Sequence, residues 1–590
     1  MSKKQVIHNE MDKPIKPKET MLRLWRYLKK DKIRLIFVAF MVICSTLSSI
    51  IAPLLLAKGI DSYIAKKTLD GLLIIIIFLA VLYVMHAVFT RIANLTMVKI
   101  TEKTLYHIRK DLFNHLQKLS LSFFDRNKKG DLMSRFTNDI TIIDEALSDA
   151  IVSMINSTIT LIGVTTIMFI INPILAITTI ATVPLFFILV FKIGSKAGEL
   201  FAKQQKQLGK LNSYTEEMIT GMKVIKSYVK EEKATEEFDK YNHNFVDTSI
   251  KAQIISNLIM PTNMAITNLS HILLFLVGAI MTVNGMATVG SILAFLNYSN
   301  MFRRPINQIG ILYASIQGAL AGAERVFEIM DTKIEVENIP NPLPFNKIKG
   351  EVLLENVNFS YTPGKQILKN INIKVEPGKN IALVGPTGAG KTTIINLLNR
   401  FYDIDSGVIK IDGTDIKKVN QNDLRRKIGI VLQDTYLFRG TVKENIKYGN
   451  MEATDEEVID AAIKSESHSF IHRLPEGYDS MIDEEGGNLS QGQRQLISIA
   501  RAILADPEIL ILDEATSSVD TRTEQAISQG MKELAKGRTT FIIAHRLSTI
   551  KNADMILVIN DGEIIEKGNH EQLLEAKGFY YNLYSNQFNI

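Results

Sequence analysis

The sequence predicts a multidomain protein in which an all-α domain of six transmembrane helices precedes an α/β nucleotide-binding domain with an antiparallel β subdomain. Three observations lead to this fold class. Uncharged apolar runs fill the first half of the chain, the second half alternates strand-like and helical segments, and the stretch GPTGAGKTT follows directly on an apolar strand. At 590 residues the chain is also too long for one hydrophobic core.

Six runs in the first half contain no Asp, Glu, Lys or Arg, and they are residues 35–57, 72–90, 150–171, 175–191, 254–283 and 289–301. The first run spans about 34 Å as a helix, enough to cross the hydrocarbon core of a bilayer. One such run could be a buried helix of a soluble protein, but six together predict a membrane domain. Pro173 separates the third run from the fourth, and the short sixth run is expected to continue past Phe302.

Lysine and arginine residues are concentrated in two connections, residues 91–149 and 192–253, whereas the other connections are short and carry few or none. Because positive residues stay on the inner side, both long loops and both termini are predicted to be cytoplasmic, in a multi-pass protein of the cytoplasmic membrane. Apolar residues recur at three- and four-residue spacing in both loops, so we expect these loops to extend the membrane helices into the cytoplasm.

The predicted domains begin with a polar tail, residues 1–17, which is expected to be disordered and cytoplasmic. Residues 18–32 favour an interfacial helix over a simple cytoplasmic helix, because four apolar residues share one helical face: Met21, Leu24, Trp25 and Leu28. The membrane domain, a linker and the nucleotide-binding domain are then expected at residues 33–310, 311–345 and 346–590.

Composition excludes several alternatives. The net charge of +6 is mild, and we expect no nucleic-acid partner. The single cysteine, Cys44, lies inside an apolar run, so an intrachain disulfide framework is excluded and the thiol is expected to be buried and unreactive.

The second half contains a strand, a G-x-x-x-x-G-K-T loop and a helix in immediate succession, which is the context of a phosphate-binding P-loop. Backbone N–H groups of such a loop surround the phosphates, Lys391 is expected to reach the β- and γ-phosphates, and Thr392 offers its hydroxyl to Mg²⁺. The predicted nucleotide-binding residues of the loop are Gly385, Pro386, Thr387, Gly388, Ala389, Gly390, Lys391, Thr392 and Thr393.

Two further strands are predicted to end in catalytic side chains. The apolar segment ILIL delivers Asp513 to the carboxyl end of its strand, where ligands of α/β sheets bind, and Asp513 suits a contact with Mg²⁺. Glu514, the next residue, is expected to act as general base or to position the attacking water. The strand-like segment TTFIIA precedes His545, which is placed to bond the γ-phosphate.

This ordered set of motifs resembles the nucleotide-binding domain of ATP-binding cassette (ABC) proteins, and the six runs ahead of it resemble a half-size ABC exporter. The motifs are Tyr361, GPTGAGKTT, Gln433 in VLQD, LSQGQ, ILILDE, SSVD and His545. The resemblance implies that Tyr361 stacks on the adenine of ATP and that Gln433 reaches both Mg²⁺ and the attacking water. It also implies that the cytoplasmic turns near FFDRNKKGD and TEEMITGMKV are coupling helices that dock on nucleotide-binding domains.

The stretch NLSQGQRQ, residues 488–495, precedes an apolar helical run, and Ser490 is a good N-terminal cap for it. The family resemblance implies more: two such domains face head to tail, and Ser490, Gly492 and Gln493 of one contact the ATP held by the other. Gln491 departs from the usual LSGGQ, and the stretch DEEGG at residues 483–487 also departs from the family pattern. An altered signature beside an intact catalytic set favours one half of a heterodimer over a homodimer.

The resemblance implies an ATPase coupled to membrane transport, and we expect the export of small apolar or amphipathic compounds of the multidrug type. A lipid flippase or lipid exporter is an alternative of the same architecture, and a nucleotide-gated channel or sensor is an alternative from another class. Intact Glu514 disfavours the channel and the sensor, because gating does not need rapid hydrolysis. The uncharged runs suit an apolar cargo, and their polar residues could line a cavity or join helices: His86, Asn156, Asn257, Asn268, His271 and Asn297.

Overall fold

The computed structural model describes residues 14–68, 71–335, 341–432, 435–513, 520–543 and 550–588. The chain forms two compact units. The membrane unit comprises Met1–Lys118 and Asn127–Lys333, and the C-terminal unit comprises Leu119–Arg126 and Ile334–Ile590. A short piece of the first cytoplasmic loop therefore belongs to the C-terminal unit.

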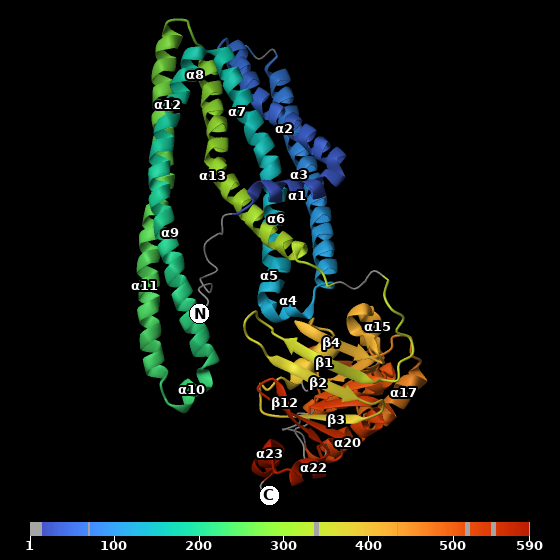
Figure 1. Cartoon of the computed structure of the whole chain (residues 1–590). Helices are drawn as coiled ribbons and strands as arrows, with labels where there is room; N and C mark the ends of the chain where they lie inside the picture. The colour runs from blue at the N-terminus through green and yellow to red at the C-terminus, as the bar shows by residue number, and fades with distance from the viewer. Residues whose placement is uncertain are drawn as a thin grey trace. The chain divides into compact units, whose positions relative to one another are not determined.

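The membrane unit is entirely helical among its described residues (Figure 1). Its α-helices are α1 Pro17–Leu28, α2 Lys32–Gly59, α3 Leu72–Leu116, α5 Lys129–Ser134, α6 Ile140–Glu145, α7 Ile151–Ile171, α8 Pro173–Ile180, α9 Val183–Thr220, α10 Met222–Ser227, α11 Glu231–Asn257, α12 Ile259–Val283 and α13 Val289–Asp331. Five helical stretches in the described part are long and apolar enough to cross a membrane. The sixth predicted run opens α13, which is not among the five, and Arg303 and Arg304 follow that run within the same helix.

The predicted runs and their cytoplasmic extensions correspond to real helices, with two interruptions. The fourth run is broken between α8 and α9, because Pro184 cannot donate a hydrogen bond to the carbonyl of Ile180 and its ring clashes with that carbonyl. Likewise α11 ends at Asn257, four residues before Pro261 in α12. The cytoplasmic parts of α9 and α11 lie side by side and are joined through α10 (Figure 1).

The end of the membrane domain differs from the expected boundary. Residues 311–331, assigned to a linker from the sequence, continue α13 as a helix. The reason is that small and apolar residues at helical spacing, among them Ala319, Ala323 and Val326, are buried against the rest of the membrane unit. Residues 336–340 of the predicted linker lie outside the described residues.

The helix α1 packs on the membrane unit through one narrow face. Thr20, Leu24 and Leu28 are buried, whereas Met21 and Trp25 of the predicted apolar face are more than half exposed. An ion pair of 2.7 Å between Arg23 and Asp331, at the end of α13, also holds this helix. The interfacial location of α1 stays a prediction, and residues 1–13 of the predicted tail lie outside the described residues.

Two of the polar residues expected to line a cavity or join helices, His86 and Asn156, bond to a neighbouring helix. The Ser45 hydroxyl contacts Nδ1 of His86 at 2.8 Å, and the Thr46 hydroxyl donates to the Asn156 side chain at 2.7 Å. The Tyr298 hydroxyl donates to the backbone carbonyl of Ile50 at 2.8 Å, inside a buried cluster contributed by α2, α7, α8, α12 and α13. His86 and Asn156 therefore have helix-joining partners.

The C-terminal unit contains two main sheets, as predicted. The antiparallel sheet has the order β2-β1-β4-β5, with β1 Val352–Phe359, β2 Leu368–Val375, β4 Ser406–Ile411 and β5 Thr414–Asp415. The larger sheet has the order β12-β11-β3-β10-β9-β6, with β3 Asn380–Val384, β6 Ile428–Val431, β9 Ile509–Asp513, β10 Thr539–Ile543, β11 Met555–Asn560 and β12 Glu563–Gly568. All neighbours in the larger sheet are parallel except β11 and β12. The short strands β7 Gly440–Thr441 and β8 Met481–Ile482 form a separate pair.

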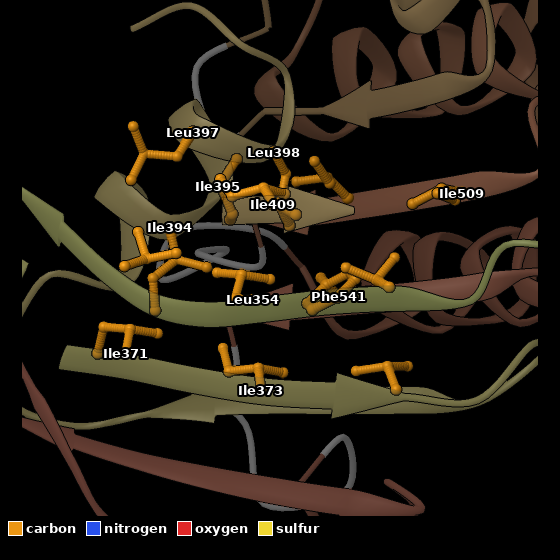
Figure 2. Close-up of a cluster of buried hydrophobic side chains, with 14 of the residues drawn as sticks. Leu354, Ile371, Ile373, Ile394, Ile395, Leu397, Leu398, Ile409, Ile509 and Phe541 are labelled. Carbon is orange, nitrogen blue, oxygen red and sulfur yellow. The ribbon is translucent and has the colours of Figure 1, made fainter. Parts of the chain in front are cut away.

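Helices of the C-terminal unit surround these sheets. They are α4 Leu121–Arg126, α14 Lys391–Leu398, α15 Gln421–Arg426, α16 Val442–Lys447, α17 Asp455–Lys464, α18 His468–Ile471, α19 Gln491–Ala505, α20 Thr521–Ala535, α22 His570–Glu575 and α23 Phe579–Phe588. Figure 2 shows apolar side chains of α14, such as Ile394 and Leu398, in the same cluster as Leu354 and Ile409 of the antiparallel sheet. This buried cluster fixes the helix that follows the glycine-rich loop.

Candidate nucleotide-binding site

The carboxyl ends of three parallel strands meet at one edge of the larger sheet. Leu383 of β3 lies opposite Ile543 of β10, and Ile543 lies opposite Asp513 of β9. The glycine-rich loop therefore leaves β3 at the edge where Asp513 ends β9. Ligands of parallel α/β sheets bind at this edge.

The glycines of the loop adopt conformations that other residues rarely do. A Cβ atom at Gly385 would lie 2.1 Å from the backbone oxygen of Ile559, so a side chain does not fit there. Gly388 and Gly390 have φ of +83° and +108°, in the region that favours glycine. Gly390 caps α14 without a side-chain hydrogen bond, so backbone N–H groups of the first helical turn face the loop. A loop of this kind at a helix N-terminus suits a phosphate.

Lys391 is held against the loop itself. Its side chain is only 8% exposed, and Nζ donates to the carbonyl oxygens of Gly385 at 2.7 Å and Pro386 at 2.9 Å. Burial lowers the pKa of Lys391, and the nearby negative charge of Asp513 acts in the opposite direction. The ammonium group is thus fixed inside the loop, with Asp513 as the neighbouring charge.

The other loop residues divide into exposed and buried ones. Pro386, Thr387 and Thr392 are exposed, so the two hydroxyls are accessible to a ligand. Ala389 and Thr393 are buried, and the Thr393 hydroxyl bonds to the hydroxyl of Tyr361 at 3.3 Å. The side chains of the buried pair therefore belong to the packing of α14.

The oxygen donors at this edge fit a magnesium ion. Thr392 offers a hydroxyl from the first turn of α14, and Asp513 offers a carboxylate from the end of β9. Mg²⁺ prefers such oxygen ligands and is commonly held by one or two protein groups together with substrate phosphates. Within the described ranges, no group of three or more His, Cys, Asp or Glu side chains could hold a metal by itself.

Tyr361 belongs to an aromatic cluster beside α14. Its ring lies edge-on to Phe359 and to Tyr402, with centroid distances of 4.8 and 4.9 Å. Its hydroxyl also accepts a hydrogen bond from the Asn396 amide at 3.3 Å. From α4, Arg126 donates to the backbone carbonyl of Tyr361 at 3.2 Å. The predicted adenine-binding residue is thus tied to both α14 and α4.

The signature segment forms a complete capping box at the start of α19. The backbone N–H of Gln493 donates to the Ser490 hydroxyl oxygen at 3.2 Å, and the Gln493 side chain accepts from the backbone N–H of Ser490 at 2.9 Å. The capping role of Ser490 is therefore confirmed. Gly492 is buried, whereas Ser490 is exposed, and among the described residues no acceptor takes its hydroxyl proton. Gln491 opens the helix, and Glu485 in the preceding stretch has φ of +57°.

Three predicted catalytic residues, Gln433, Glu514 and His545, lie outside the described residues, so their roles stay predictions. The described strands that precede them do end at the common edge. In the motif SSVD, Asp520 caps α20 by accepting a hydrogen bond from the backbone N–H of Thr523 at 3.0 Å.

Sequence reasoning missed two residues around Tyr361. Tyr402 packs against its ring, and Asn396 bonds its hydroxyl. Asn396 follows the loop by three residues and could have been found from helical spacing, since it shares a face with Thr393. Tyr402 carries no motif that would have marked it.

Comparison with known families matches both halves of the chain. Residues 35–306 match the ABC transporter transmembrane region, and residues 368–517 match the ABC transporter family. A helical membrane unit on the same chain as an ATP-binding domain defines an ATPase coupled to membrane transport.

Several relatives match the chain over both domains. The chain is 43% identical to an uncharacterized ABC transporter ATP-binding protein, YfiC, of Bacillus subtilis, over 97% of this chain and 94% of that one. It is 42% identical to a fatty acid ABC transporter ATP-binding/permease protein of Mycobacterium bovis, over 89% of this chain and 82% of that one. An ATP-dependent lipid A-core flippase of Syntrophus aciditrophicus is 37% identical over 93% and 91% of the two chains.

The fold agrees with a solved structure of a bacterial Atm1-family ABC exporter with ATP bound. The TM-score is 0.76 and the identity 30%, over 94% of this chain and 98% of that one. The chain belongs to the ABC transporter family and is an exporter half-transporter, with one transmembrane and one ATP-binding domain. It is a multi-pass membrane protein whose nucleotide-binding domain is cytoplasmic, and the predicted fold class is confirmed.

Proposed function

We propose that this half-transporter exports amphipathic molecules with long acyl chains, lipids or fatty acids among them, across the cytoplasmic membrane. One observation carries the proposal: two relatives matched over both domains are named for such substrates, a fatty acid transporter and a lipid A-core flippase. The long apolar stretches of the membrane helices suit the same cargo. The multidrug range expected from the sequence is a broader form of this proposal and stays a prediction.

The nucleotide site supports ATP hydrolysis as the driving step. In our proposal Lys391 and the loop N–H groups bind the phosphates, and Tyr361 stacks on adenine. Thr392, Gln433 and Asp513 hold Mg²⁺, which when bound neutralises charge that develops on the phosphates. Glu514 positions or deprotonates the attacking water, and His545 bonds the γ-phosphate.

The chain is proposed to work as half of a dimer. Outside the predicted membrane runs, α9 and α11 expose apolar side chains, including Phe201, Val246 and Ile250. Exposed apolar surface away from the membrane indicates a protein partner. In the dimer, Ser490, Gly492 and Gln493 would approach the nucleotide bound by the other half.

We propose a different half-transporter as the partner, because Gln491 adds a side chain where the family signature has glycine. ATPase activity separates this heterodimer from a homodimer. The chain purified alone is expected to hydrolyse ATP slowly, and the co-expressed pair at least tenfold faster. Cooperative turnover by the chain alone, at the rate of the pair, would remove the case for a distinct partner.

Transport is tested in inside-out vesicles that contain the chain with its partner. ATP is expected to drive accumulation of a labelled long-chain fatty acid or phospholipid, and vesicles with Glu514→Gln are expected to accumulate neither. A labelled cationic drug in parallel vesicles tests the multidrug range. Flux that equilibrates without ATP hydrolysis would overturn the exporter and favour a channel.

A further inference from the structure

A cationic side chain lies among the membrane helices, two residues beyond the last uncharged run. Arg303 of α13 is half-buried and donates hydrogen bonds to the hydroxyl of Thr267 in α12 and, at 3.3 Å, to the hydroxyl of Thr182. It also reaches the backbone carbonyl of Ile266 at 3.5 Å. Thr182 lies at the break between α8 and α9, so three helical segments converge on one guanidinium group.

The charge of Arg303 has only neutral partners in the part of the chain that the structure describes. No carboxylate there forms an ion pair with it, and its hydrogen-bond acceptors are two hydroxyls and one carbonyl. Both hydroxyls donate their own protons to backbone carbonyls, Thr267 to Asn263 at 2.7 Å and Thr182 to Thr179 at 3.0 Å. A membrane arginine without a counter-ion is costly to keep, which marks it as functional.

The depth of Arg303 follows from its place in α13. The helix begins at Val289, on the outer side in the predicted orientation, and fourteen residues at 1.5 Å rise place Arg303 about 21 Å further in. In a hydrocarbon core of about 30 Å this is the inner half of the bilayer. The guanidinium group therefore lies in the hydrocarbon region, on the side of the inner leaflet.

The register between α12 and α13 extends this polar site outward. A Cβ atom at Gly278 would meet the Ile292 side chain at 2.9 Å, and Ile266 contacts Arg303, so the two helices run antiparallel. Counting back along α12 from Gly278 and forward along α13 from Ile292 brings Ser270 opposite Ser299.

Both of these serines are only 1% exposed, and neither hydroxyl has a hydrogen-bond partner within the described ranges. Nε2 of His271, the residue after Ser270, is also buried without a partner there. Buried polar atoms nearly always have partners, so an unpartnered group needs an explanation. Hydroxyl, imidazole and guanidinium groups can all donate hydrogen bonds to an oxyanion.

We propose that Arg303, with Ser270, His271 and Ser299, binds the anionic head group, a carboxylate or phosphate, of the transported amphiphile. This inference rests on the proposed export of acyl-chain molecules and narrows it to acidic ones. The planar guanidinium group binds such oxyanions through paired hydrogen bonds. The cavity at Arg303, lined also by Thr182, Val183, Phe186 and Ile306, measures about 10 Å³. A head group therefore enters as the helices separate, and it replaces the two threonine contacts.

The experiment compares ligands that differ only in the head group, with the transporter and its partner in phosphatidylcholine nanodiscs. Palmitate carries a carboxylate head group, and hexadecanol has the same chain length with a neutral hydroxyl. Acetate and inorganic phosphate are anions without an acyl chain long enough to enter the membrane. We expect palmitate to stimulate ATP hydrolysis at a concentration about tenfold lower than hexadecanol, the size of one hydrogen bond to a charged group. Acetate and inorganic phosphate should have no effect.

Substitutions at Arg303 and at the adjacent Arg304 test which of the two arginines binds the head group. Arg303→Gln is expected to remove the preference for palmitate while leaving stimulation by hexadecanol unchanged, and Arg303→Lys to retain part of the preference. Arg304→Gln is the matched control, since Arg304 is adjacent and exposed, and it should behave as the parent protein. Ser299→Ala, which keeps the charge, is expected to weaken palmitate binding a few-fold and gives a second test if Arg303→Gln does not fold.

Equal stimulation by palmitate and hexadecanol in the parent protein, or an unchanged preference in Arg303→Gln, would overturn the inference and leave lipid export intact. Stimulation by acetate alone would assign the site to a free anion and overturn it as well. If neither long-chain ligand stimulates hydrolysis or is transported, the proposed function itself fails.

Discussion

The hydroxyl of Tyr402 donates a hydrogen bond to the carboxylate of Asp125 in α4, and its ring packs edge-on against Tyr361. Burial raises the pKa of Tyr402, and the bond to Asp125 raises it further, so the hydroxyl stays protonated and able to donate. Within the C-terminal unit, α4 is therefore connected to the residue expected to hold adenine through the ring of Tyr402 as well as through Arg126.

Tyr402→Phe tests whether this bond couples α4 to the nucleotide site. The variant keeps the ring but loses a hydrogen bond to a charged group, worth about 1.5 kcal/mol at an exposed carboxylate such as Asp125. We expect basal ATP hydrolysis to stay within about twofold, while stimulation by transported substrate falls about tenfold. Tyr436→Phe, at an exposed tyrosine of the same unit, is the control. Unchanged stimulation in Tyr402→Phe would contradict a coupling role.

Lys391→Ala should weaken ATP binding itself. The ammonium group is fixed by two loop carbonyls, and its removal deletes a charged contact to the phosphates, so affinity is expected to fall at least about tenfold. Binding of a fluorescent ATP analogue measures this. Lys379→Ala is the matched control, because that lysine forms an exposed ion pair with Asp554 on the surface of the same unit. ATP affinity unaltered by Lys391→Ala would refute the phosphate role.

Glu514→Gln should separate binding from turnover. Glutamine keeps the size of the side chain but cannot accept a proton, so ATP is expected to bind normally while hydrolysis falls by about a hundredfold or more. Steady-state phosphate release and ATP retention after gel filtration measure the two quantities. Hydrolysis near the parental rate would assign the base to another residue.

The C-terminal unit is expected to lose stability in acid because of His570. Its Nδ1 contacts the Tyr580 hydroxyl at 2.8 Å, and burial, followed by the charge of Lys551, lowers its pKa below the ordinary value of 6.5. The unfolded chain therefore takes up the proton first as pH falls below about 6.5, and stability decreases over that range. Thermal unfolding at pH 7.5 and 5.5 should show a larger acid shift for the parent than for His570→Gln. Equal shifts would exclude His570 as the cause.

Local sequence patterns correctly predicted the structural features that are formed by neighbouring residues in the chain. Gly385 to Thr393 specify the loop by themselves, because the glycine conformations and the following helix are local properties. The strand before Asp513 and the cap at Ser490 were likewise readable from neighbouring residues. Two helix interruptions were present in the sequence as Pro184 and Pro261, yet both were assigned to continuous runs because hydropathy outweighed the proline rule.

Other features depend on contacts between residues far apart in the sequence, which local patterns do not predict. Asp125 and Tyr402 are separated by 277 positions and meet only through the fold. Arg303 was passed over because the uncharged run ends at Met301, although α13 continues through it. Residues 311–331 were assigned to a linker because their burial cannot be seen in the sequence. In the structure they are helical, and Ala323 and Val326 are buried against neighbouring helices.

Leu383, Ile543 and Asp513 occupy one transverse row of the larger sheet. The described strand segments that lead to the phosphate loop, to Glu514 and to His545 are consequently anchored on a shared support. Sliding β10 by a single position would misalign all of these segments together, and no repair confined to one of them could restore the others. A change in register would therefore have to involve all three strands together.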